Sequence, residues 1–119
     1  MNKDNLIVNK SKAFALRILK LNQFLFCEKS ITDLRKQILR SGTSIGANVK
    51  EAIRGQSKAD FYAKINIALK EASETEYWLE ILYESGYIPS KPFESIYSDC
   101  QELIKILIAI SKSQNSNNS

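Results

Sequence analysis

The segment that decides the fold reads RSGTSIGANVKEAIR and occupies residues 40–54. Two glycines, Gly42 and Gly46, stand four residues apart among small hydroxyl side chains. A Walker-type phosphate loop needs a G-x-x-x-x-G-K-[ST] spacing after a buried strand. Here the spacing is shorter, no lysine follows the second glycine, and no strand pattern precedes the first. We therefore interpret the segment as part of a helix.

Winding residues 32–54 at about 100° per residue supports one continuous helix. An apolar stripe continues through the glycines on one side, and it consists of Leu34, Ile38, Ile45, Val49 and Ala52. Gly42 and Gly46 lie on a flank of this stripe, beside Leu39 and Ile53, where missing side chains let another backbone approach. Each glycine costs about 1 kcal/mol relative to alanine. Close packing should offset this cost, against the first or third helix or against a neighbouring subunit.

The opposite face of the same helix is basic. It carries a basic ridge of Lys36, Arg40, Lys50 and Arg54, with the short residues Thr43 and Ala47 between the two pairs. Cations spaced in this way can bind a nucleic-acid backbone without reading the bases. The alternative is an ordinary solvated face, partly neutralised by Glu51.

Three more amphipathic segments are expected at about residues 8–28, 57–85 and 90–112. The segment 57–85 keeps a four-three alternation of apolar residues from Phe61 to Leu82, which is typical of a bundle seam. Thr32 and Ser57 are predicted N-caps, and Gly55 and Gly86 are predicted stops.

Four helices with short connections predict an all-α, up-down-up-down antiparallel four-helix bundle. We place this single domain at residues 1–112. The polar tail, residues 113–119, is expected to be disordered.

The first helix has two apolar sides. Ala15, Leu19 and Phe26 form a second apolar line beside the bundle-facing one, and a helix of this kind must bury both sides. We therefore predict packing within the bundle and contact with another chain, that is, a homo-oligomer. Its predicted helix-packing or interface residues are Leu19, Phe26, Leu39, Gly42, Gly46 and Ile53.

Composition excludes most catalytic chemistry. The chain of 119 residues has no histidine, which removes Ser-His-Asp and Cys-His mechanisms and the Glu-x-x-His pairs of di-iron bundles. The carboxylates that an enzyme reading would use are Glu71, Glu74 and Glu76. Cys27 and Cys100 are expected to be free, buried thiols in a reducing compartment. We predict no catalytic residue, metal or cofactor.

Charge is distributed unevenly along the chain. Residues 1–70 hold fourteen Lys/Arg against five Asp/Glu, and residues 71–119 hold three against eight, so the balances are +9 and −5. Such a split favours an anionic partner or head-to-tail contact between subunits. The most apolar run, residues 103–110, is far shorter than the roughly 20 residues of a membrane span. With no signal peptide visible, we expect a cytoplasmic protein that does not enter a membrane.

Three stretches together resemble a known family. They are LRSGTSIGANVKEAIRGQSKADF at 39–61, LKEASETEYWLEIL at 69–82 and FESIYSDCQELIKIL at 93–107. The sequence is similar, over about residues 5–112, to the four-helix-bundle protein family, also called the 23S rRNA intervening-sequence protein family.

The resemblance implies a bundle that assembles as a ring, typically a homopentamer. It also implies a fold shared with accessory proteins of diversity-generating retroelements, which associate with a reverse transcriptase and nucleic acid. By this resemblance Arg40, Lys50 and Arg54 are candidate nucleic-acid contacts, although Lys50 departs from the pattern of many relatives. The family offers no catalytic residues.

Two functions follow as hypotheses. The first is a non-enzymatic oligomer that binds RNA or DNA through the basic ridge, with a protein partner such as a reverse transcriptase. The second is a purely structural or protein-interaction oligomer, in which acidic residues of the segment 57–85 meet the basic half of a neighbour. Salt-sensitive binding to a polyanion separates them.

Overall fold

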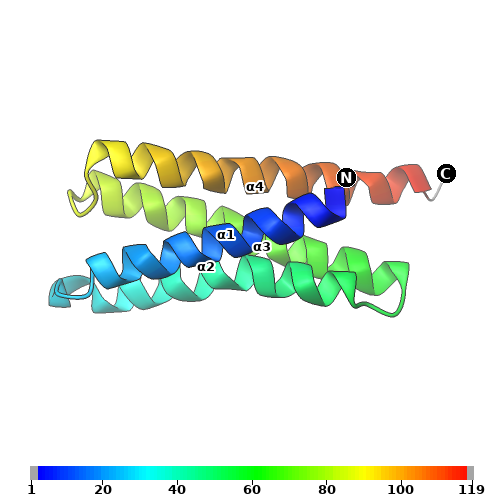
Figure 1. Ribbon diagram of the computed structural model, residues 1–119, viewed down its shortest axis with the longest axis horizontal. Helices are drawn as coiled ribbons and strands as arrows, with labels where there is room; N and C mark the ends of the chain where they lie inside the picture. The colour runs from blue at the N-terminus through cyan, green and yellow to red at the C-terminus, as the bar shows by residue number, and fades with distance from the viewer. Residues whose placement is uncertain (1–2, 118–119) are drawn as a thin grey trace.

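The computed structural model describes residues 3–117, and the side chains of residues 5–114. Its elements are α1 (Lys3–Phe24), the 3-10 turn η1 (Lys29–Ile31), α2 (Thr32–Ile53), α3 (Lys58–Glu84) and α4 (Ser90–Asn117). Each helix runs antiparallel to the next in a bundle of 49 × 23 × 21 Å (Figure 1). α1 packs on α2 and α4, and α3 packs on the same two helices. For the described residues, the predicted all-α four-helix bundle is confirmed.

The core follows the predicted periodicity. Ile38, Ile45 and Val49 of α2 are completely buried. In α3 the seam begins at Tyr62 rather than at the predicted Phe61. Phe61 is half-buried and packs edge-on against the Tyr62 ring. The hydroxyl of Tyr62 lies 2.9 Å from that of Ser113, so this aromatic residue joins α3 to α4.

The helix ends follow the expected chemistry with one exception. Ser57 caps α3 by accepting a hydrogen bond from the backbone of Asp60 at 3.1 Å, as predicted. Gly86 ends α3 with a φ of 86°, a conformation that side chains rarely adopt. The prediction for Thr32 was wrong. It is the first residue of α2, and its hydroxyl donates to the carbonyl of Lys29 at 2.8 Å because η1 turns the chain directly before it.

Two further expectations need correction. α4 continues to Asn117, so residues 113–117 of the expected tail are helical; residues 118–119 lie outside the described part. Cys27 is free, as predicted, but it is exposed, whereas Cys100 is free and buried. The difference arises because α1 ends at Phe24, which leaves Cys27 in the turn beyond the packed helix.

Candidate nucleic-acid interface

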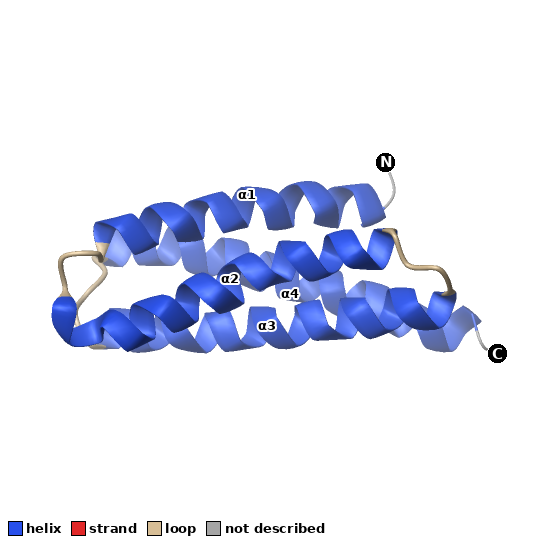
Figure 2. Cartoon of the chain, turned by 90° about the horizontal axis from the view of Figure 1, so that it is seen from below, coloured by secondary structure: helices blue, strands red, loops and turns tan. Residues whose placement is uncertain are grey.

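The paired glycines of α2 pack against α1 of the same chain. A Cβ atom added to Gly42 would lie 2.7 Å and 2.9 Å from side-chain atoms of Ile18. One added to Gly46 would lie 3.3 Å from the carbonyl oxygen of Ser11. Both helices can therefore approach closely only because these side chains are absent. Figure 2 shows α1 and α2 side by side along this contact.

This helix contact leaves a groove on its outer side, with a volume of about 550 Å³. α1 contributes Lys12 to the groove, and α2 contributes Lys50 and Arg54. We call it the basic groove. The remaining lining is small or apolar apart from two neutral polar residues; it consists of Val8, Asn9, Ala15, Thr43, Gly46, Ala47 and Ile53. Within the described residues, none of the three cations belongs to an ion pair.

A second hollow adjoins the basic groove and shares Lys50 and Arg54 with it. Lys64 of α3 lies in this hollow and pairs with Glu51 at 3.4 Å. In the alternative of an ordinary solvated face, Glu51 was expected to neutralise part of the basic ridge. Its partner is instead on α3, which leaves Lys50 and Arg54 without that carboxylate.

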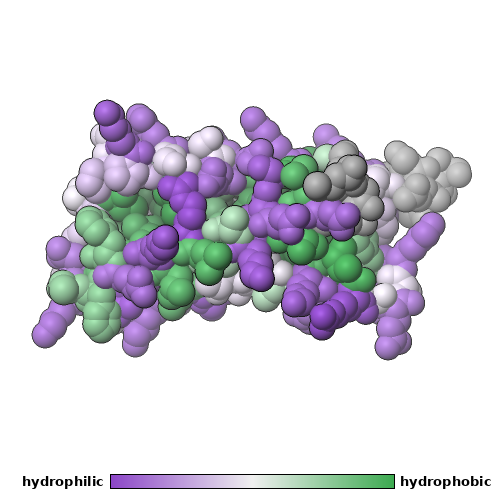
Figure 3. All heavy atoms as spheres, in the orientation of Figure 1, coloured by the Kyte–Doolittle hydropathy of each residue, from purple (hydrophilic) through white to green (hydrophobic). Residues whose placement is uncertain are grey.

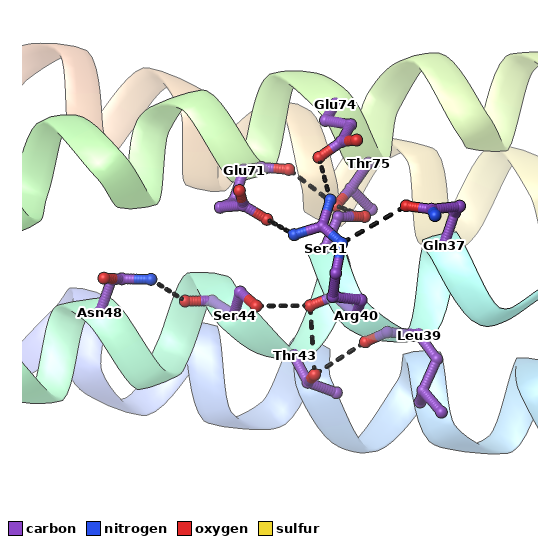
Figure 4. A network of polar contacts seen from close by, with 10 residues as sticks. All are labelled: Gln37, Leu39, Arg40, Ser41, Thr43, Ser44, Asn48, Glu71, Glu74 and Thr75. Carbon is purple, nitrogen blue, oxygen red and sulfur yellow. Dashed lines mark hydrogen bonds and ion pairs between the residues drawn. The ribbon is translucent and has the colours of Figure 1, made fainter.

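Arg40 turns away from the groove and toward α3. Its guanidinium donates to Glu71 at 2.8 Å and also to the carboxylate of Glu74 (Figure 4). The hydrogen bonds, first with Glu74 and then with Glu71, raise the pKa of Arg40 above its ordinary value. Arg40 is therefore a cation that already has two anionic partners.

Lys36 is exposed but stands apart from the groove. It precedes Lys50 by fourteen residues, which corresponds to about 21 Å along an α-helix. The structure therefore brings together two of the four predicted contacts, Lys50 and Arg54, and adds Lys12. Lys36 lies too far along α2 to reach the groove, and Arg40 is paired with Glu71 and Glu74.

The predicted interface residues divide between core and surface. Leu39 is half-buried and packs on the core, and the two glycines form the contact with α1. Leu19 and Phe26 are 45% and 62% exposed, and we call these two residues the apolar patch. The Arg35 guanidinium lies 4.9 Å from the centre of the Phe26 ring. Figure 3 shows hydrophobic side chains among hydrophilic ones on the face that α1 presents.

Sequence reasoning missed Lys12. Lys12 follows Ser11, the α1 residue against which Gly46 packs. This contact brings Lys12 into the same groove as Ala47 and Lys50. The glycine flank signalled a close neighbour, but nothing in the pattern said that α1 was the neighbour. The pairing of Arg40 had a visible signal, because Glu71 and Glu74 lie three residues apart on one helix face.

Two kinds of site are absent from the described residues, a metal centre and a membrane span. No three His, Cys, Asp or Glu side chains among them gather closely enough to hold a metal ion. No helix in this part of the chain is long and apolar enough to cross a membrane.

The fold and the site together define an antiparallel four-helix bundle with a cationic groove between its first two helices. The sequence model of the 23S rRNA-intervening sequence protein family matches residues 3–109, and the chain belongs to that family.

A crystal structure at 1.70 Å from Bacteroides thetaiotaomicron, of a protein with unknown function from the S23 ribosomal protein family, is similar to this chain. It has 55% sequence identity and a TM-score of 0.89, over 93% of this chain and 99% of that one. No curated protein matches the chain.

Proposed function

We propose that this protein is a non-enzymatic, oligomeric protein of the cytoplasm that binds RNA or other nucleic acid through the basic groove. One observation carries the proposal: Lys12, Lys50 and Arg54 converge from two helices on one groove and lack ion-pair partners within the described residues. Unpaired cations gathered in a concave surface attract phosphate and release the counterions bound to it.

The lining of the groove favours contact with the backbone over contact with bases. Among the described residues, no aromatic side chain lines it, so this lining has no platform on which an unpaired base can stack. Asn9 and Thr43 add neutral polar groups beside the cations. We therefore expect binding that depends weakly on sequence and strongly on salt. Three phosphate contacts to a single strand give a salt slope of about −2 for each chain.

Self-association would strengthen this binding. The apolar patch leaves two large side chains in water, and burying them against a second copy is favourable. In the ring, typically of five subunits, that the family resemblance implies, each subunit would carry one basic groove. Contacts that are weak singly would then act together on one nucleic-acid chain. A partner such as a reverse transcriptase, also implied by the resemblance, would act on the same nucleic acid.

A salt titration of filter binding with a 20-nucleotide single-stranded RNA tests the proposal. The variant Lys50→Gln/Arg54→Gln should bind about 25-fold more weakly at 0.1 M salt, with a slope smaller by about 1.4, because two phosphate contacts are lost. The control Lys91→Gln/Lys105→Gln removes the same charge from exposed positions on α4. It should stay within about threefold of the wild type, because net charge alone acts weakly across a Debye length.

The competing function is a purely structural or protein-interaction oligomer. The capture of Arg40 by Glu71 and Glu74 favours it, since this cation of the ridge serves the fold. Under this function the wild-type oligomer ignores RNA at all salt concentrations. Equal losses in the α2 and α4 charge variants would also reject the basic groove.

A further inference from the structure

Arg40 has all three guanidinium nitrogens in hydrogen bonds. Nη1 donates to Glu71 at 2.8 Å, Nη2 donates to Glu74, and Nε donates to Gln37 at 3.4 Å. Each terminal nitrogen of the guanidinium thus donates to a separate carboxylate, so the paired Nη groups that bind a phosphate in a fork are both engaged. Three of the five N–H donors are therefore used in these contacts, and both Nη groups already face an anion.

The surroundings of this cluster hold it in place. Thr75 donates to the buried hydroxyl of Ser41 at 2.8 Å, which ties α3 to α2 directly beside Arg40. Ser44 donates to the carbonyl of Arg40 at 2.6 Å. Figure 4 shows these bonds around the guanidinium. Neither helix has to move for Arg40 to reach the carboxylates, so the cluster is preorganised by the α2–α3 contact.

Exposure decides which partner faces the solvent. The Arg40 side chain is 47% exposed, against 16% for Glu71 and 33% for Glu74. Arg40 is therefore the most exposed of the three side chains, and it is accessible to an incoming phosphate. The cluster nevertheless carries one positive and two negative charges, a net charge of −1 that repels a polyanion.

We propose that Glu71 and Glu74 occupy Arg40 in place of nucleic-acid phosphate, and thereby confine nucleic-acid binding to the basic groove. This inference rests on the proposed function and deepens it, because it states where the binding surface ends and which residues end it. Removing the two carboxylates frees a cation on the α3 side of the ridge, ten residues or about 15 Å along α2 from Lys50. The binding surface then gains a phosphate contact.

Four chains test the inference in a cycle: the wild type, Glu71→Gln/Glu74→Gln, Arg40→Gln, and the triple variant. Affinity for the 20-nucleotide RNA is measured by fluorescence anisotropy between 0.05 M and 0.3 M salt. With Arg40 present, the two Glu→Gln changes should raise affinity about fivefold at 0.1 M salt and steepen the slope by about 0.7, as expected for one more phosphate. In the Arg40→Gln background the same changes should raise affinity by less than twofold.

Equal gains in both backgrounds would mean that the carboxylates act through the general field, and this result would overturn the inference. No gain in either background would overturn it as well. Thermal unfolding followed by circular dichroism verifies that each chain is folded. Glu71→Ala/Glu74→Ala serves as a second variant, because alanine favours the helix and cannot accept the hydrogen bonds that glutamine can.

Nuclear magnetic resonance of the arginine Nε–H groups separates the two proposals. RNA should shift Arg54 but not Arg40 in the wild type, and both residues in the Glu→Gln variant. An Arg54 signal that ignores RNA in the wild type rejects the proposed function. An Arg54 signal that shifts while Arg40 stays unmoved in the Glu→Gln variant rejects only the role of Glu71 and Glu74.

Discussion

The α1–α2 pair and the α3–α4 pair of this bundle differ in the contacts that their surface side chains make within the chain. On the α3–α4 pair the Phe93 ring stacks between those of Tyr83 and Tyr97, at centroid distances of 4.1 and 4.9 Å. The hydroxyl of Tyr97 also donates to Glu80 at 2.6 Å. The α1–α2 pair instead keeps three unpaired cations in the basic groove and two large apolar side chains in the patch. The proposed function assigns partner binding to this α1–α2 surface.

The largest expected effect is on self-association. Leu19→Glu/Phe26→Glu places two charges in the apolar patch and should convert the proposed oligomer to monomer, because burying charge at an interface is strongly unfavourable. Both side chains are exposed, so the fold should survive. Size-exclusion chromatography with light scattering gives the mass.

The α3–α4 pair provides a matched control for this change. Ile67 and Ile108 are also exposed, at 41% and 38%, and Ile67→Glu/Ile108→Glu should leave the mass unchanged. A monomer from this variant and an intact oligomer from the other would reverse the comparison between the two helix pairs.

The next effect concerns the glycine contact beneath the α1–α2 surface. Gly42→Ala should lower the free energy of unfolding by up to about 2 kcal/mol. The new Cβ overlaps Ile18, and overpacking costs about 1–3 kcal/mol against about 1 kcal/mol gained in helix propensity. Gly46→Ala meets only a 3.3 Å contact, so its change should stay below about 1 kcal/mol. Urea denaturation measures both; equal losses would show that the two glycines pack equally tightly.

The last effect belongs to the α3–α4 pair, and it develops only at high pH. Burial raises the pKa of the Cys100 thiol from 9.0 to about 12, and the hydrogen bond to Glu80 raises the pKa of Tyr97 from 10.0 to about 12. Above pH 9 the unfolded chain therefore holds fewer protons than the folded one, so stability falls as pH rises from 9 toward 12. Thermal unfolding at several pH values should show a shallower decline for Cys100→Ala and for Tyr97→Phe. Identical slopes for all three chains would contradict this account.

Most of the fold could be predicted from the sequence, because apolar periodicity depends on the helix alone. Ile38, Ile45 and Val49 mark a stripe that any α-helix through those residues would bury. The candidate site depends on which helices are neighbours and at what register. Lys12 and Lys50 line one groove because Gly46 packs against Ser11. A helical projection of α2 contains no information about this neighbour.

Arg40 teaches the same lesson from the other direction. On the projection it is equivalent to Arg54, and both were predicted to bind nucleic acid. Arg40 lies on the side of the ridge next to α3, where Glu71 and Glu74 are within reach. The RNA titrations test whether each of the two arginines binds nucleic acid.

Gly46 has one consequence that concerns how variation at its position is interpreted. The same missing side chain lets α1 approach and keeps the bottom of the groove low. A bulky residue there would push the two helices apart and also fill part of the basic groove. Selection for a sturdy bundle and selection for ligand access would therefore both retain glycine, so its presence in a relative is no proof that the relative binds nucleic acid.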